Sequence, residues 1–255
     1  MTYAEVNGIR LYYEAHGKGP AVVLAHGRSG NTLSWWQQIP VLARRRTVVA
    51  FDHRGFGRSA DLPGGPGRKA FVDDLRALLD HLGIRRTALV AQSMGGLTCL
   101  GFALRHPERS SALVMADTSG GIAEPEILEI YRRKRQPPAD PVERALGPTF
   151  RKRAPEGAYL YRQILAMNPP PPESLESVLM SEDGPRREQL AQLKVPTLFL
   201  MGAEDQTVNA QIARSCAKLI PGARLKIVPR AGHSVYFEQP KVFNRLVEGF
   251  LKGKK

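Results

Sequence analysis

The segment Ala91-Gln92-Ser93-Met94-Gly95-Gly96 decides the fold of this 255-residue chain. It follows the apolar run 87–91 and precedes a helical pattern over 97–105. A serine among small residues at a strand–turn–helix junction is typical of a nucleophile elbow, which holds the hydroxyl at the carboxyl edge of a sheet. The alternative is a helix N-cap rich in Ser and Gly, and Ala91 departs from the usual Gly-x-Ser-x-Gly pattern. Because an apolar strand comes directly before it, we predict that Ser93 is a nucleophile.

Short apolar runs recur on both sides of this segment and alternate with helical patterns. Such near-continuous aliphatic runs predict strands buried on both faces, as in a parallel sheet. Strands that alternate with helices indicate βαβ units with right-handed crossovers. The sequence therefore predicts an α/β fold with a mostly parallel, doubly wound sheet. The other predicted strands are 9–15, 21–25, 47–51, 112–116, 197–201 and 225–228, and the other core helices are 71–82, 208–219 and 242–251.

Residues 122–190 interrupt this alternation. They are rich in proline, including the run Pro169 to Pro172, and short amphipathic pieces lie between the prolines. We therefore expect a helical lid inserted into a core that consists of residues 1–121 and 191–255. No independent second domain is expected.

The charge of the chain is its unusual compositional feature. There are 37 Lys and Arg residues against 24 Asp and Glu, a formal net charge of +13. A surplus of this size is compatible with a nucleic-acid or membrane partner. However, residues 122–190 carry 11 charges of each sign, and the basic residues elsewhere are scattered without a nucleic-acid motif. We predict a small-molecule substrate and no nucleic-acid or membrane partner; the oligomeric state stays open.

Cysteine usage and the N-terminus bear on location and metal binding. The chain has only Cys99 and Cys216, far apart and without the spacing of a zinc site. The N-terminus has no basic segment followed by an apolar stretch, and no run approaches the ~20 apolar residues of a membrane span. We expect a cytoplasmic protein without a bound metal.

A serine nucleophile needs a base, and the base needs a carboxylate partner. His233 follows the last predicted strand, which would bring it to the same edge of the sheet as Ser93. Asp205 follows the strand 197–201 and is the leading candidate for the acid. Its neighbour Glu204 could mislead this assignment, and Asp117, at the end of another strand, is the alternative acid.

The oxyanion of an acyl-transfer intermediate needs preorganised donors. The segment Ala25-His26-Gly27-Arg28-Ser29-Gly30 follows a predicted strand and matches a His-Gly-x-x-Gly loop. We predict that the backbone N–H groups of Arg28 and Met94 form the oxyanion hole. His26 would then be structural and would hold the loop.

These motifs resemble those of the α/β-hydrolase superfamily, and the similarity spans essentially the whole chain. The segment Asp52-His53-Arg54-Gly55-Phe56-Gly57-Arg58-Ser59 is also similar to that family's structural Asp-x-x-Gly-x-Gly-x-Ser loop. The resemblance implies a catalytic serine, histidine and acid at the three matched positions. It also implies a lid that shapes the pocket, and ester hydrolysis without a metal or an organic cofactor.

Within this superfamily the elbow narrows the choice of branch. Ser93 argues against haloalkane dehalogenases and epoxide hydrolases, which have aspartate there, and the elbow differs from the Gly-Gly-Ser-Trp-Gly of proline iminopeptidases. Carbon–carbon-bond hydrolases usually have an Asn-Ser-x-Gly-Gly elbow, which weakens that alternative. We predict a carboxylesterase-like serine hydrolase that cleaves esters or lactones through an acyl-enzyme. Enol-lactonases, carbon–carbon-bond (vinylogous diketone) hydrolases, cofactor-free perhydrolases and ligand receptors with vestigial activity stay open.

The substrate pocket is the least determined part of the prediction. Arg28 could pair with a carboxylate on the substrate, or its side chain could point into solvent. Aromatic residues and a methionine are further candidates for the pocket, although they could equally pack into the core of the protein or of the lid. These candidates are Trp35, Trp36, Tyr131, Phe150, Tyr159 and Met167.

Overall fold

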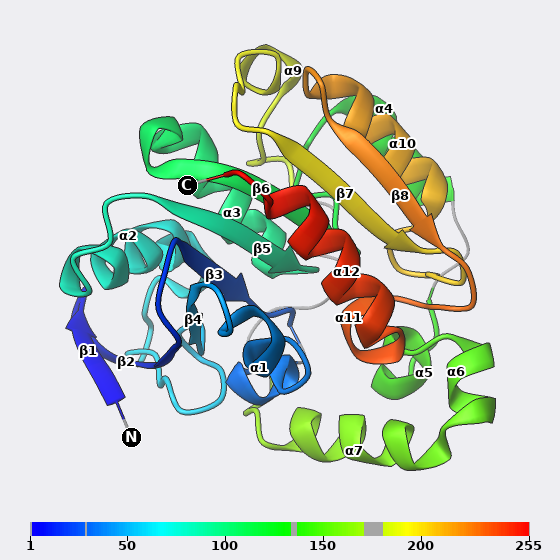
Figure 1. The fold of residues 1–255 in the computed structure, drawn as a ribbon. Coiled ribbons are helices and arrows are strands. Elements are labelled where there is room, and N and C mark those ends of the chain that lie inside the picture. The colour runs from blue at the N-terminus through cyan, green and yellow to red at the C-terminus, as the bar shows by residue number, and fades with distance from the viewer. Residues whose placement is uncertain (1, 29, 134–136, 171–180, 255) are drawn as a thin grey trace.

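The computed structural model describes residues 2–28, 30–133, 137–170 and 181–254, and in this part of the chain eight strands form one sheet. The strand order is β1-β2-β4-β3-β5-β6-β7-β8. The strands β3 to β8 are parallel, whereas β1 and β2 are antiparallel additions at one edge. The predicted α/β fold with a mostly parallel sheet is therefore confirmed (Figure 1). The strands are β1 (Thr2–Val6), β2 (Ile9–His16), β3 (Ala21–Ala25), β4 (Thr47–Phe51), β5 (Thr87–Gln92), β6 (Ser110–Ala116), β7 (Thr197–Gly202) and β8 (Arg224–Val228).

Helices cover both faces of this sheet, because successive side chains of a strand point to opposite faces. In β5, Leu89 and Ala91 join one apolar cluster with α2, α3, α4 and α10, whereas Ala88 and Val90 join a second cluster with α1, α11 and α12. These helices are α1 (Ile39–Leu42), α2 (Phe71–His81), α3 (Gly95–Arg105), α4 (Pro125–Arg133), α10 (Ala210–Leu219), α11 (Val235–Glu238) and α12 (Pro240–Leu251). Short 3₁₀ turns are η1 (Thr32–Trp35), η2 (Gly67–Ala70) and η3 (Pro107–Arg109).

The prolines of residues 122–190 mark where helices begin. Pro125, Pro141, Pro148 and Pro155 are the first residues of α4, α5 (Pro141–Ala145), α6 (Pro148–Arg153) and α7 (Pro155–Ala166). Proline suits this position because its fixed φ is helical and its missing N–H would have no partner in the helix. The last described helix of this stretch is α9 (Arg187–Leu190).

The helices of residues 122–190 lie in two places. The helix α4 packs beside α10 on one face of the sheet, whereas α5, α6 and α7 lie beyond the carboxyl ends of the parallel strands (Figure 1). Among the described helices of this stretch, α5 to α7 are therefore the ones placed to cover a site at that edge. Among the described residues, no helix combines the length and the apolar character that crossing a membrane requires.

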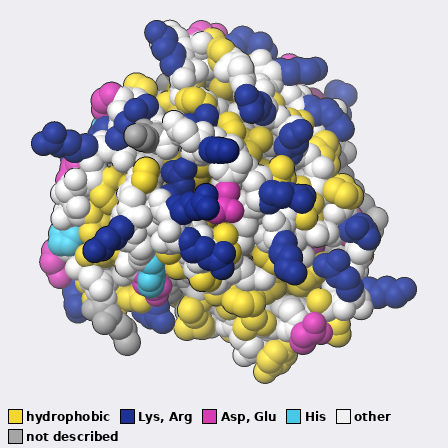
Figure 2. Space-filling view, viewed as in Figure 1, with side chains coloured by type: hydrophobic (Ala, Val, Ile, Leu, Met, Phe, Trp, Pro, Cys, Tyr) yellow, Lys and Arg dark blue, Asp and Glu magenta, His cyan; other side chains and the backbone are white. Residues whose placement is uncertain are grey.

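Basic side chains are spread widely over one face of the molecule. Figure 2 shows Lys and Arg side chains distributed across the face that α12 crosses, with few acidic side chains among them. Many of the arginines that the structure describes pair with an acid nearby, as Arg76 does with Asp80. Such exposed pairs contribute little to stability.

Candidate active site

Ser93 lies on a sharp turn between β5 and α3. Its φ is +49°, a left-handed conformation that is strained for a residue with a side chain. The turn is held from both sides, because the Ser93 N–H donates to the carbonyl of Ala116 (3.0 Å) and the Ser93 carbonyl accepts from the Thr118 hydroxyl (2.7 Å). Both partners lie at the end of β6, so the neighbouring strand fixes the position of the serine.

The glycines that follow Ser93 allow this turn to lie against the sheet. A Cβ atom on Gly95 would lie 2.2 Å from the carbonyl oxygen of Ala25, and one on Gly96 would lie 2.3 Å from the hydroxyl of Thr118. No side chain fits at such distances, so α3 can begin this close to β3 and β6 only with glycine at both positions. The small residues of the elbow therefore have a steric reason.

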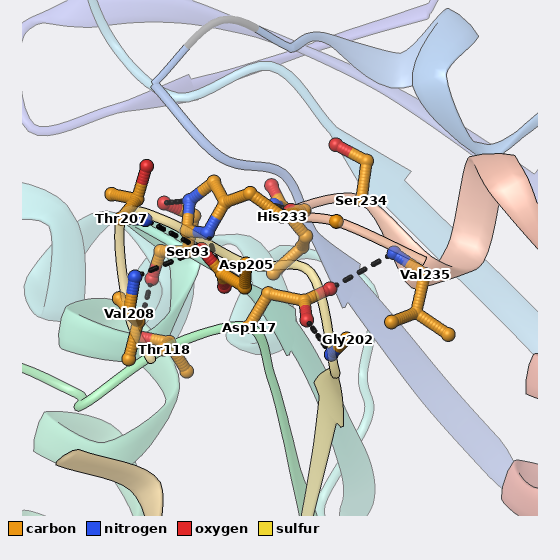
Figure 3. Close-up of polar contacts among 12 residues, drawn as sticks. Ser93, Asp117, Thr118, Gly202, Asp205, Thr207, Val208, His233, Ser234 and Val235 are labelled. Carbon is orange, nitrogen blue, oxygen red and sulfur yellow. Dashed lines mark hydrogen bonds and ion pairs between the residues drawn. The ribbon is translucent and has the colours of Figure 1, made fainter. Parts of the chain in front are cut away.

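Ser93, His233 and Asp205 form a continuous chain of hydrogen bonds (Figure 3). His233 Nε2 lies 2.8 Å from Ser93 Oγ, and His233 Nδ1 lies 2.8 Å from Asp205 Oδ2. Since a carboxylate accepts only, Nδ1 carries the proton and donates it to Asp205, and Nε2 is left to accept from the serine hydroxyl. The arrangement can activate the hydroxyl as a nucleophile.

Asp205 is itself fixed in place. Its second carboxylate oxygen, Oδ1, accepts the backbone N–H groups of Thr207 (2.7 Å) and Val208 (2.9 Å). Both oxygens are thus engaged, and the side chain is almost fully buried. The imidazole therefore meets a carboxylate whose orientation is set before any substrate arrives.

Asp117, the alternative acid, has a different set of partners. Its carboxylate accepts the N–H groups of Gly202 (2.9 Å) and Val235 (3.0 Å), and thereby joins the end of β7 to α11 (Figure 3). Complete burial, together with the nearby charge of Asp205, raises the pKa of Asp117 well above its usual range. In the structure the histidine bonds to Asp205, and Asp117 links the segments that flank the two.

Glu238 holds the loop that carries His233. Its carboxylate accepts the N–H groups of Gly232 (2.9 Å) and Ser234 (3.2 Å), one on each side of the histidine, and that of Gly147 (3.0 Å). Gly147 and Gly232 are in close contact, since a Cβ on Gly232 would lie 2.3 Å from the nitrogen of Gly147. One buried side chain therefore joins the histidine loop to the residue that precedes α6.

Glu204 makes the corresponding contact from the loop of the acid. It accepts both the backbone N–H and the hydroxyl of Thr149, a residue of the first turn of α6. Residues 147–149, which we call the α6 anchor, are thus bonded to the neighbours of Asp205 and of His233. No sequence pattern indicated this connection.

The carboxyl of Glu238 gives a test of this packing by pH. Burial raises its pKa from 4.5 to about 7, so between these pH values the native state holds a proton that the unfolded state releases. The stabilisation is complete below pH 4.5 and is lost as the pH rises through 7. From pH 5 to pH 7.5 we expect the free energy of unfolding of the wild type to fall by about 2 kcal/mol more than that of Glu238→Gln. Denaturant titrations across this range measure it, and parallel curves for the two proteins would contradict it.

The loop predicted to form the oxyanion hole lies directly against the elbow. A Cβ on Gly27 would lie 2.0 Å from the side-chain oxygen of Gln92 and 3.0 Å from Cβ of Ser93. Met94, on the other side of the serine, is the N-cap residue of α3, and N–H groups at a helix N-terminus lack partners within the helix. That Arg28 and Met94 supply the donors stays a prediction, and these contacts support it.

Two buried histidines support this loop. His26 donates from Nδ1 to the carbonyl of Gly27 (2.7 Å) and accepts at Nε2 from the N–H of His53 (2.9 Å), and His53 Nε2 lies 2.8 Å from the Thr98 hydroxyl. Burial lowers the pKa of both histidines. Both therefore stay neutral, and the fixed tautomer of His26 holds the turn at Gly27.

Enlarging Gly27 should disturb the loop without removing a reactive group. In Gly27→Ala the new methyl group clashes with Gln92 and Ser93, so the loop must move away from the elbow. We expect kcat/KM for an ester to fall about 100-fold, the usual effect of losing one oxyanion donor. Gly249→Ala is the matched control, since nothing lies within 4 Å of its Cβ position. Equal activity of both variants would show that the loop does not contact the reacting group.

Two cavities adjoin the elbow. The small cavity, about 30 Å³, contains Ser93 and His233, and the large cavity, about 470 Å³, adjoins Met94; Arg28 lines both. Sequence reasoning missed Arg144 and Tyr161, whose positions in the insertion have no fixed spacing from Ser93. The small cavity is lined by Arg28, Gln92, Ser93, Pro141, Arg144, Ala145, Tyr161, Thr207 and His233. The large cavity is lined mainly by Arg28, Arg54, Phe56, Asp61, Leu62, Arg68, Phe71, Met94, Pro169 and Pro170.

The side chains suggested as further pocket residues lie elsewhere. Trp35 is fully buried against aromatic rings of α11 and α12, whereas Trp36 is 49% exposed. Tyr131 is buried in α4 and donates a hydrogen bond to Ser119 (3.1 Å). None of these three lines either cavity as described. Trp35 and Tyr131 therefore pack in the core, whereas much of Trp36 faces solvent.

The remaining candidates come from α6 and α7. Phe150 packs against Phe237 of α11, with ring centroids 6.0 Å apart. Tyr159 and Met167 are 67% and 50% exposed. The described lining of the two cavities does not include them either. The described residues of 122–190 that line the two cavities are instead Pro141, Arg144, Ala145, Tyr161, Pro169 and Pro170.

The described residues form no cluster that could bind a metal ion, and both cysteines are buried. In the described ranges no group of three or more His, Cys, Asp and Glu side chains could hold a metal ion. Cys99 and Cys216 are buried free thiols, and burial raises the pKa of both well above its usual range.

Comparisons with known proteins agree with this architecture. A family model described as alpha/beta hydrolase fold matches residues 20–136 and 132–240. A putative carbamate hydrolase RutD from a Caulobacter species is 30% identical over 95% of this chain and 96% of its own length. The 3-oxoadipate enol-lactonase 2 of Acinetobacter baylyi is 28% identical over 96% of this chain and 94% of its own. The solved structure of a thermophilic esterase from Thermogutta terrifontis superimposes on this one with a TM-score of 0.81. The two sequences are 29% identical, and the match covers 98% of this chain and 96% of the esterase chain.

Proposed function

Because the chain belongs to the alpha/beta hydrolase family, we propose that it is a serine hydrolase that cleaves carboxylic esters or lactones through an acyl-enzyme intermediate. The observation that carries the proposal is the chain of hydrogen bonds from Ser93 through His233 to Asp205. Each of these side chains follows a parallel strand at the same edge of the sheet. The esterase and enol-lactonase relatives support this substrate class.

The first half of the reaction forms the acyl-enzyme. His233 Nε2 accepts the hydroxyl proton as Ser93 Oγ bonds to the carbonyl carbon of the substrate. The carbonyl oxygen becomes an oxyanion, which the N–H groups of Arg28 and Met94 stabilise. Asp205 stabilises the protonated imidazole, which then gives its proton to the leaving oxygen as the ester bond breaks.

The second half repeats these steps with water. His233 accepts a proton from a water molecule, whose oxygen bonds to the acyl carbon. The second oxyanion collapses, the bond to Ser93 Oγ breaks, and His233 returns the proton to the serine. The acid leaves, and the enzyme is restored without a net change in its protons.

We further propose that α5, α6 and α7 act as the lid. The small cavity supports this, since Pro141 and Arg144 of α5 and Tyr161 of α7 line it together with Ser93 and His233. A lid built from these helices would decide which substrates reach the serine. The helix α4, which packs against α10, would then belong to the core.

An active-site-directed fluorophosphonate tests the proposal directly. We expect it to label the protein at Ser93, which mass spectrometry of the digested protein locates. A panel of short and long acyl esters, lactones and vinylogous diketones then separates the esterase, lactonase and carbon–carbon hydrolase alternatives. Labelling without steady-state turnover would favour a receptor with vestigial activity, and a lack of labelling would contradict a serine hydrolase.

A further inference from the structure

An arginine from the insertion shares the small cavity with the serine. Arg144 of α5 and Arg28 both line it, together with Ser93 and His233. The described lining contains no Asp or Glu, so the charge at its walls is positive. Neither hydrolysis of a neutral ester nor the hydrogen bonds of the triad require a second cation at this place.

The charge of Arg144 is only weakly compensated. Its described hydrogen bonds run from Nη1 to the carbonyls of Pro138 and Ala139, both long at 3.3 Å. Burial lowers the pKa of Arg144, and the nearby Tyr161 and Asp140 offset this effect only in part. A half-buried guanidinium of this kind beside a nucleophile is a candidate for ligand binding.

The acid whose charge acts on Arg144, Asp140, is already engaged. Asp140 accepts the N–H groups of Val142 and Glu143 (both 2.9 Å) as the N-cap of α5, and it also pairs with Arg162 at 3.1 Å. Its negative charge is therefore shared with a second arginine and a helix N-terminus. The site retains attraction for a further anion.

The position of His233 indicates which part of a substrate enters this cavity. The histidine protonates the leaving oxygen, so the leaving alcohol must lie on its side of the serine. His233 lines the small cavity, whereas Met94 lines the large one, which leaves the large cavity for the acyl chain. A cavity of about 30 Å³ holds ~two water molecules. A group the size of a carboxylate fits this space, and a long alcohol does not.

We propose that the small cavity is a subsite for a carboxylate on the leaving alcohol, bound by the guanidinium groups of Arg144 and Arg28. The preferred substrates are then acyl esters of small hydroxycarboxylic acids. Arginine suits this task because its planar fork donates two parallel hydrogen bonds to a carboxylate. The inference rests on the proposed serine hydrolase activity and specifies the substrate class of that same site.

Two isosteric substrates test the subsite. O-butyryl-lactate has the carboxylate, and O-butyryl-lactamide has a neutral amide of the same shape; release of butyrate measures both. In the wild type we expect the carboxylate substrate to have the higher kcat/KM. In Arg144→Gln the ratio of the two kcat/KM values should fall about 10- to 100-fold, as for the loss of hydrogen bonds to a charged group. Arg144→Lys, which keeps the charge but not the fork, should retain part of the preference.

Arg133→Gln is the matched control. This arginine lies on α4, its side chain is 80% exposed, and it pairs with Glu129. The substitution removes the same charge from the protein, and the ratio should stay as in the wild type. An equal fall in Arg133→Gln would assign the preference to the overall positive field, and an unchanged ratio in Arg144→Gln would overturn the subsite.

Protection of Ser93 from the fluorophosphonate gives a readout that does not need turnover. Lactate should slow the labelling of the wild type more than lactamide does, and Arg144→Gln should lose this difference. A lack of lactate protection in a protein that is labelled overturns the subsite alone. A protein that is neither labelled at Ser93 nor active on either ester overturns the serine hydrolase proposal itself.

Discussion

Replacing Ser93 by alanine should lower kcat for ester hydrolysis by ~10⁴- to 10⁶-fold, the range found when the nucleophile of such a triad is removed. The reason is that His233 then has no hydroxyl to deprotonate, and only the oxyanion donors and binding contribute. The measurement is steady-state turnover of a chromogenic ester that the wild type hydrolyses. Activity within tenfold of the wild type would contradict the role of Ser93.

The stability of serine variants provides the control for this loss. Alanine keeps the Cβ atom and hence the strain of a φ of +49°, so Ser93→Ala should unfold at nearly the same temperature as the wild type. Ser93→Gly, which relieves that strain, should be more stable by about 1 kcal/mol although it is equally inactive. Thermal unfolding of the three proteins checks both statements and shows that lost activity is not lost structure.

The second large effect concerns the acid. In Asp205→Asn the amide oxygen is taken by the N–H groups of Thr207 and Val208, so the amide NH2 faces Nδ1 and holds the histidine in the wrong tautomer. We expect kcat to fall by ~10⁴-fold with little change in KM, as is found when a triad aspartate becomes asparagine. The pH dependence of kcat should change as well, because the imidazolium loses its stabilising charge.

Asp117→Asn is the natural comparison. Asp117 bonds to the N–H groups of Gly202 and Val235 and not to the histidine. Each oxygen of the Asp117 carboxylate accepts one of these N–H groups, whereas asparagine has only one oxygen, so one buried N–H loses its acceptor. This variant should therefore lose stability, while its kcat falls by less than about tenfold. If instead Asp117→Asn lost kcat as Asp205→Asn is expected to, Asp117 would be the catalytic acid.

Much of this architecture could be predicted because it depends on local sequence. The parallel strands are continuous aliphatic runs, and Asn7-Gly8, both at positive φ, turns β1 into β2 as an Asn-Gly pair favours. The elbow could be recognised because steric contact requires glycine at positions 95 and 96, shortly after Ser93. Thr2–Val6 was not predicted as a strand, since its pairing with β2 becomes evident only across the hairpin.

The pocket could not be predicted in the same way. Whether an aromatic residue of the insertion faces the serine depends on how α5 to α7 dock on the sheet, and the sequence does not encode that docking in a local period. Tyr159 faces solvent, whereas Tyr161, two residues later, lines the small cavity. Arg144 is one of 37 basic residues, and only its position in space distinguishes it from the others.

The α6 anchor has a consequence for how such a protein could open. Residues 147–149 are bonded through Glu238 and Glu204 to the immediate neighbours of His233 and Asp205. Any movement that lifts α6 must first break these bonds or pull on the two loops. If α5 to α7 form the lid that we propose, its opening and the loss of catalytic alignment would be the same event, and the protein would be competent for chemistry only while the lid is closed.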